Sequence, residues 1–223
     1  MKIKKQLSIK GFFLPAIALC SLLISGNAAH AALVTYSFDG TVGSVSGALR
    51  STFPVGSSLM SGTFSYDTVP SGTTGRYMDA VKSLSFTIGG YEVNFDPMGD
   101  TNVIRITDSS SGDLWRLRTS VTGDPVGMGE FKPVDFRLNL ADEDGVAITG
   151  KALNNPPSLG DLTSTHWRLV FEDMDGKTVR VQGVLNSLTA VPLPAAVILF
   201  GAGLISLVGL GAGGLRNFRW PQL

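Results

Sequence analysis

Alternation of apolar and polar side chains constrains this chain more than any other feature of its sequence. Residues 34–39 and 83–88 alternate strictly, and residues 91–95 repeat the pattern directly after Gly89-Gly90. Successive side chains of an extended strand point to opposite faces, so a period of two predicts strands with one buried face. The Gly-Gly pair predicts a hairpin between the second and third of these segments. The central part of the chain is therefore expected to be all-β.

Seven further strands are predicted, and clusters of Gly, Pro, Asn, Asp and Ser separate them. They cover residues 58–66, 102–107, 113–121, 134–140, 146–152, 166–172 and 178–189. No segment between residues 32 and 190 has a helical period of useful length. About ten short strands in a single domain of this size predict an antiparallel β-sandwich with a jelly-roll-like arrangement, in preference to a barrel.

The sequence contains one internal echo. Residues 136–145 match residues 167–176 in register and share an arginine, a leucine, two aspartates and a glycine. In each copy the aromatic and leucine positions are expected to face inward and the arginine, Arg137 or Arg168, outward. Asp-x-Asp-Gly is typical of a turn, since Asp tolerates a left-handed backbone and Gly adopts it freely. The echo predicts two equivalent hairpins in one domain.

The first 31 residues have the pattern of a secretory signal peptide. Four lysines precede a mostly apolar segment, residues 11–25, which predicts an N-terminal signal helix. Ala29 and Ala31 are the small residues that a signal peptidase requires, so cleavage is expected after Ala31. The only cysteine, Cys20, lies within the signal. The mature chain is therefore expected to form no disulfide bond.

The C-terminal part, residues 191–219, begins with Val-Pro-Leu-Pro-Ala-Ala at 191–196 and continues in an uncharged apolar run at 197–215. At about 1.5 Å per residue such a helix approaches the roughly 30 Å of bilayer hydrocarbon, which predicts a C-terminal transmembrane helix. Arg216 and Arg219, in the basic end at 216–219, are expected to act as a cytoplasmic stop-transfer signal. Residues 32–190 would then form an ectodomain outside the cytoplasm, anchored at the inner membrane. An ordinary C-terminal membrane anchor would have the same apolar run and the same basic end.

This C-terminal pattern resembles the PEP-CTERM sorting signal of Gram-negative bacteria. The resemblance covers roughly the last 30 residues, with Val191, Pro192, Leu193 and Pro194 as the sorting motif; Leu193 stands where the namesake motif has Glu. It implies export by the general secretion machinery and recognition by an exosortase, a membrane protease-transpeptidase. It further implies delivery to the outer surface or to an exopolysaccharide matrix, with exopolysaccharide as a candidate partner. Several segments between residues 36 and 91 also resemble an ectodomain that other PEP-CTERM proteins carry.

The charge of the expected ectodomain differs from that of the whole chain. All 18 acidic residues lie between residues 32 and 190, but six of the 18 basic residues lie outside, so the domain carries 12 − 18 = −6. A mildly acidic domain is not expected to bind nucleic acid, anionic lipid or acidic polysaccharide through its bulk charge. Local recognition of such ligands stays open.

No motif in the ectodomain predicts a catalytic or cofactor site. Asp142, Asp144, Asp173 and Asp175 are weak candidates for calcium binding, but their spacing does not match the twelve-residue calcium loop, and solvated hairpin turns explain them as well. His166 is the single histidine of the mature domain and is expected at the surface. The chain has no Gly-x-Ser-x-Gly motif and no phosphate-binding glycine loop. No cofactor is expected.

Taken together, these features predict an exported, non-enzymatic protein of the cell surface or extracellular matrix. Two alternatives remain open. A carbohydrate-binding module would expose rings among Tyr77, Trp115 and Trp167 for stacking on sugars. A secreted glycan-active enzyme would place two carboxylates about 5–10 Å apart in a cleft.

Overall fold

A computed structural model describes residues 33–192, apart from residues 71, 129 and 154. The described chain is antiparallel and all-β, with two short 3-10 turns, η1 (Gly47–Leu49) and η2 (Leu159–Asp161). Its strands are β1 (Leu33–Val45), β2 (Leu59–Asp67), β3 (Gly72–Thr73), β4 (Arg76–Met78), β5 (Val81–Ile88), β6 (Tyr91–Phe95), β7 (Asn102–Thr107), β8 (Asp113–Thr122), β9 (Lys132–Asp142), β10 (Ser164–Glu172) and β11 (Thr178–Ala190).

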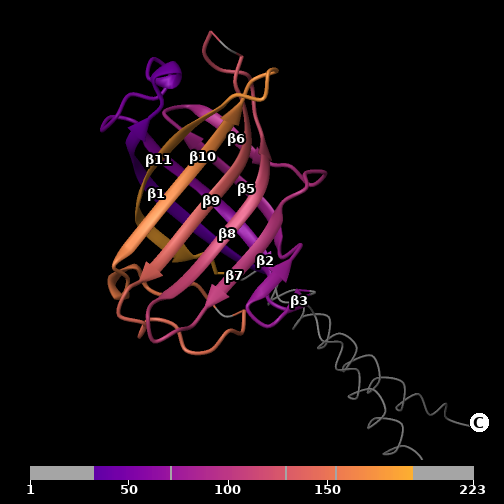
Figure 1. The fold of residues 1–223 in the computed structure, drawn as a ribbon, viewed down its shortest axis with the longest axis vertical. Coiled ribbons are helices and arrows are strands. Elements are labelled where there is room, and N and C mark those ends of the chain that lie inside the picture. The colour runs from indigo at the N-terminus through magenta and orange to yellow at the C-terminus, as the bar shows by residue number, and fades with distance from the viewer. Residues whose placement is uncertain (1–32, 71, 129, 154, 193–223) are drawn as a thin grey trace, which may run out of the picture. The chain divides into compact units, whose positions relative to one another are not determined.

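Eight of these strands close into a barrel (Figure 1). The order around the ring is β8-β6-β5-β2-β1-β11-β10-β9, and β9 returns to pair with β8. Closure depends on the long β8–β9 ladder, which runs from Asp113 opposite Asp142 to Ser120 opposite Asp135. Strand β7 pairs with the other edge of β8 beside the short β6 contact, and β4 and β3 extend that flank.

The predicted β-sandwich is therefore wrong, because one continuous sheet closes on itself instead of two sheets packing face to face. Both folds require strands with one buried face, so alternation alone does not separate them. The strands bend into the ring at register shifts, of which two lie in the β1–β11 ladder, one in β2–β5 and one in β9–β10. Such bulges increase local twist and curvature and allow a sheet to close.

The interior of the barrel is filled by side chains. Eight strands enclose a space that side chains can just fill, and here aromatic rings dominate it. Phe86 and Phe136 meet with ring centroids 4.7 Å apart, Phe38 lies 6.3 Å from Phe136, and Phe64 lies 6.2 Å from Trp115. These rings come from β1, β2, β5, β8 and β9, so packing across the interior joins opposite sides of the ring.

Loops cover both ends of the barrel. At one end, the segment between β1 and β2 inserts Leu49 and Phe53, both fully buried, and the Phe53 ring packs against Tyr91 and Phe171. At the other end, the long connection between β9 and β10 buries Leu153. The Tyr77 hydroxyl donates to the Lys151 carbonyl at 2.7 Å and fastens the same connection to β4. Apolar side chains of these connections thus extend the core at each end of the barrel.

Two predicted helices lie outside the described residues. They are the expected signal helix and the expected C-terminal transmembrane helix, residues 197–215. Among the described residues 33–192, no helix has the length and apolar character needed to cross a membrane.

Most predicted strands match the structure, with one exception. Residues 146–152 form no strand but part of the β9–β10 connection, and β3 and β4 were not predicted. The echo segments lie in neighbouring strands of the barrel, with Arg168 directly opposite Arg137. Only the second copy ends in a tight hairpin turn, since the first enters the long β9–β10 connection.

Candidate functional site

Arginines occupy the outward positions of neighbouring strands. In β8, Trp115 and Leu117 are buried in the interior, and Arg116 and Arg118 alternate with them on the outside. The same alternation places an arginine outside on β4, β7, β9 and β10. We call this set the arginine face; its members are Arg76, Arg105, Arg116, Arg118, Arg137 and Arg168.

The strand register places these arginines directly opposite one another. Arg76 lies opposite Arg105, and Arg105 lies opposite Arg116. In the second row, Arg118 lies opposite Arg137, which lies opposite Arg168. Neighbouring strands are about 4.8 Å apart, so each row of three spans roughly 10 Å. The two rows meet on β8, where Arg116 and Arg118 occupy successive outward positions.

One carboxylate faces this set of cations. Asp135, itself on β9 and 8% exposed, accepts from Arg118 Nε at 2.6 Å and from Arg137 Nη2 at 3.4 Å. Arg116 Nε donates instead to the neutral Asn139 side chain at 2.7 Å. In the part of the chain that the structure describes, no other acidic side chain forms an ion pair with the arginine face. The arginine face thus contains six guanidinium groups and one carboxylate, which pairs with two of them.

The crowding has an electrostatic cost. Burial lowers the pKa of Arg116 from its ordinary value, and the charges of Arg137, Arg105, Arg118 and Arg168 lower it further. Like charges directly opposite in a sheet destabilise the pairing. The Arg137 Nε group is buried and has no hydrogen-bond partner among the described residues. An unsatisfied buried donor destabilises the fold as well.

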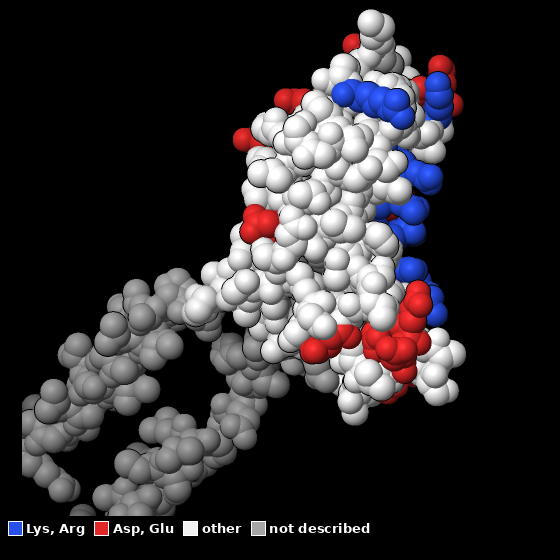
Figure 2. Space-filling view, turned by 90° about the vertical axis from the view of Figure 1, so that its left-hand side faces the viewer, with Lys and Arg blue, Asp and Glu red and all other residues white. Residues whose placement is uncertain are grey.

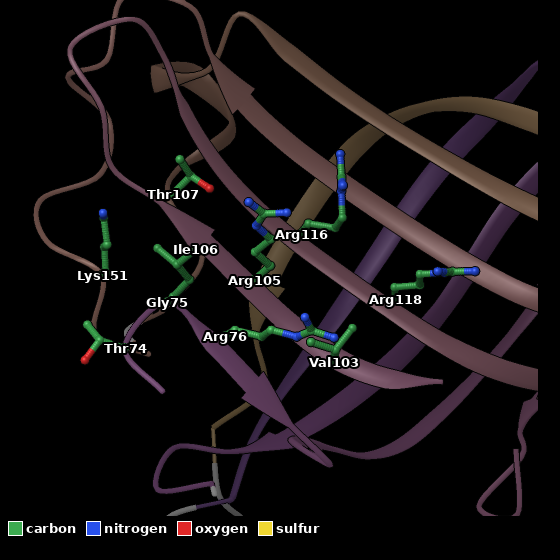
Figure 3. A pocket seen from close by; sticks show the side chains of 10 residues that line it. All are labelled: Thr74, Gly75, Arg76, Val103, Arg105, Ile106, Thr107, Arg116, Arg118 and Lys151. Carbon is green, nitrogen blue, oxygen red and sulfur yellow. The ribbon is translucent and has the colours of Figure 1, made fainter. Parts of the chain in front are cut away.

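Lysine and arginine side chains gather along one side of the molecule, at the right-hand edge of Figure 2, and the surface turned to the viewer carries few charges. The close view in Figure 3 shows Arg76, Arg105, Arg116 and Arg118 on adjacent strands around a shallow open pocket. Lys151 adds a further cation from the β9–β10 connection. A second open pocket lies beyond Arg168 and is lined by the polar side chains of Asn139, His166 and Gln182.

The calcium candidates have structural roles in the folded chain. The Asp142 carboxylate accepts the backbone N–H groups of Asp144, Val146 and Ala147 at 2.9 to 3.3 Å. The bond from Val146 N–H is the main reason that the pKa of Asp142 lies below its ordinary value. The structure thus engages this carboxylate in organising its own loop.

Asp173 organises the second turn in the same way. Its Oδ1 atom accepts the N–H groups of Asp175 and Lys177 at 3.1 and 2.9 Å. Among the described residues, no group of three or more His, Cys, Asp or Glu side chains is arranged to hold a metal ion. Asp144 and Asp175 are exposed in these turns.

The structure also places the remaining sequence candidates. Trp115 and Trp167 are each 1% exposed, so neither indole is presented to a sugar, and His166 is exposed on the outside of β10. Of the sorting motif, Val191 and Pro192 are described and exposed. Outside the described residues lie Ala29, Ala31, Leu193, Pro194, Arg216 and Arg219.

The arginine face was not predicted from the sequence as a unit. The echo placed Arg137 and Arg168 on the outside, but it gave no partner strand for either. The net charge of −6 over residues 32–190 concealed the face, because most of the acidic residues lie elsewhere, mainly in turns and loops. The available signal was the occurrence of arginine at outward positions in five predicted strands, four of which contribute to the arginine face.

Comparisons with known proteins found no match to this chain among protein-family models, curated proteins or solved structures.

Proposed function

We propose that this chain is an exported protein of the cell surface or extracellular matrix, and that its barrel performs no chemistry of its own. In this proposal the segment beginning at Val191 is a sorting signal for an exosortase-type enzyme. The observation that carries it is the position of the two ends of the described chain. Val191 N–H donates to the Thr35 carbonyl at 2.8 Å, so β1 begins and β11 ends side by side at the same end of the barrel.

This placement suits a folded domain that is processed at both ends. The expected signal-peptidase cut after Ala31 lies just before β1, which begins at Leu33, and Val191 directly follows β11, which ends at Ala190. Cuts at these two places would leave the pairing of Tyr36 with Ala190 and the rest of the barrel ladders in place. The sides of the barrel, including the arginine face, would stay accessible on a domain held by one end.

The interior also favours a protein without catalytic chemistry. Asp113 and Asp142 lie opposite each other in the β8–β9 ladder, and both are buried. Asp113 accepts the N–H groups of Ser109 and Ile148 at 3.2 and 2.8 Å, and Asp142 is engaged with its own loop. Because these carboxylates hold loop backbone, we assign them to the structure and not to glycan hydrolysis.

The intact masses of the protein from the host's envelope and from its culture medium test this proposal. We expect a product that begins at Ala32 and ends between Val191 and Ala196, with or without an added group, in the envelope surface fraction or in the medium. Replacing Pro192 and Pro194 by alanine should prevent the C-terminal cut and leave the N-terminal cut unchanged.

A product that retains residues 197–223 in every fraction would contradict the sorting proposal. A product that retains residues 1–31 and remains in the cytoplasm would contradict export itself.

A further inference from the structure

We propose that the arginine face is a binding site for a carboxylate-bearing polysaccharide, a polyuronate, laid across strands β4, β7, β8, β9 and β10. The uronate carboxylates would pair with the guanidinium groups of the two arginine rows. The inference rests on the proposed export only for where the protein meets this polymer; the binding itself is a property of the folded barrel.

The arginine face brings like charges together at a cost in stability. Four pairs of directly opposed residues consist of two arginines each. They are Arg76 with Arg105, Arg105 with Arg116, Arg118 with Arg137, and Arg137 with Arg168. The outward positions of a barrel strand tolerate small neutral polar residues such as the serines and threonines found on β1 and β2. Folding therefore does not require these cations, and an external polyanion would relieve their repulsion.

The face already binds one carboxylate through guanidinium groups, as we propose for the uronates. Asp135 lies between Arg118 and Arg137 and receives a hydrogen bond from each. The planar guanidinium group suits carboxylates because its N–H donors match the two oxygens. Arg76, Arg105 and Arg168 have no such partner among the described residues, and Arg76 and Arg105 are exposed. They are free to bind the carboxylates of a ligand.

The site is long and its cations are regularly spaced. The rows repeat at the strand spacing of about 4.8 Å, and Arg116 and Arg118 are separated by about 6.7 Å along β8. A single small anion can reach two or three of these groups, whereas a chain with one charge on each sugar can reach all of them. Polymer binding gains from this multiplicity without any single strong contact.

The residues beside the arginines favour a glycan over a nucleic acid. Asn139, His166 and Gln182 line the neighbouring pocket with Arg168, and such side chains exchange hydrogen bonds with sugar hydroxyls. Single-stranded nucleic acids are bound largely by stacking on exposed aromatic rings. Trp115 and Trp167 are buried, and the Tyr77 hydroxyl is engaged by Lys151, so the described part of this face offers no stacking platform.

Affinity for alginate oligomers, a polyuronate, tests the proposal. The binding variant is the triple substitution Arg105→Gln, Arg116→Gln and Arg168→Gln, which leaves the Asp135 pairs intact. The control is the triple substitution Arg50→Gln, Lys82→Gln and Lys177→Gln, which removes the same charge from positions outside the face. Binding is measured by titration calorimetry on the purified full chains, with thermal melting to confirm folding.

We expect the unmodified protein to bind alginate and to bind the uncharged glucan dextran far more weakly. The face variant should lose at least about tenfold in affinity, because charged hydrogen bonds are lost at three positions. The control variant should stay within about twofold. Absence of alginate binding, equal losses in both variants, or tighter binding of a single-stranded DNA of matched charge would each overturn the proposal. None of these results bears on the masses of the exported product, so the two proposals fail separately.

The Asp135→Asn variant provides a second test, in which the affinity for alginate is expected to change in the opposite direction. Removal of the internal carboxylate releases Arg118 and Arg137 for the ligand, so the affinity for alginate should rise although the melting temperature falls. An affinity that falls together with the melting temperature would show that the face is only a structural network.

Discussion

Gly183→Ala is expected to prevent the barrel from closing normally. A β-carbon at residue 183 would overlap the Thr41 carbonyl oxygen and would lie 2.9 Å from Cζ2 of Trp167. Residue 183 lies in the β1–β11 ladder, so the clash with backbone forces two paired strands apart. Overpacking commonly costs about 1–3 kcal/mol, and a clash with a fixed backbone belongs at or above the upper end of that range. A domain with the usual stability of roughly 5–15 kcal/mol would lose a large share of it.

Urea unfolding followed by tryptophan fluorescence measures this loss. Gly160→Ala is the matched control, because a β-carbon at residue 160 meets nothing within 4 Å. The control should change the free energy of unfolding by no more than about 0.5 kcal/mol. Equal unfolding midpoints for the two variants would contradict the packing described here.

Trp167→Ala is expected to lower the free energy of unfolding by about 3–5 kcal/mol, the usual range for removal of a buried tryptophan. The indole is 1% exposed and its Nε1 donates to the Val184 carbonyl at 3.3 Å. It packs over two glycines, since a β-carbon at Gly40 or Gly183 would approach its ring to about 3 Å. Glycines at these two positions contribute no side chain that could fill the cavity.

Val184→Ala is the control for this prediction, because Val184 lies on the outside of β11 and is 40% exposed. We expect its effect on thermal or urea unfolding to be less than about 1 kcal/mol. If Trp167→Ala were no more destabilising than Val184→Ala, the indole would not be part of the core.

The local structure of this chain could be predicted because alternation acts over a few residues. The segments predicted at 102–107, 113–121 and 166–172 lie close to strands β7, β8 and β10. The choice between barrel and sandwich depends on whether Asp113 to Ser120 meets the strand that ends at Asp142. That pairing is a long-range event, and the same pattern of buried faces satisfies either fold.

Residues 146–152 show why alternation alone predicted one strand that is absent. Val146 and Ile148 have the spacing of a strand, but their N–H groups donate to the carboxylates of Asp142 and Asp113. Backbone groups that are satisfied by side chains need no neighbouring strand. Propensity could not reveal this competition, because it depends on two carboxylates meeting at the end of the barrel.

The arginine face was beyond prediction for a related reason. Alternation gave the outward direction of Arg137 and Arg168, but only the β9–β10 register shows that they lie directly opposite. The opposition of Arg105 and Arg116 likewise requires the β7–β8 register. A net charge summed over the domain describes none of this, since binding depends on where the charges lie.

We propose that the protein uses the outside of its barrel, at the arginine face, to hold an acidic polymer. The most direct measurement is a nuclear magnetic resonance titration of the full chain with alginate oligomers, observed at the Nε–H resonances of its arginines. We predict that the resonances of the arginine face shift together and saturate, and that the resonance of Arg50, near the η1 end of the barrel, stays unchanged. Shifts of similar size at Arg50 and at the arginine face, or no shifts at all, would contradict the account.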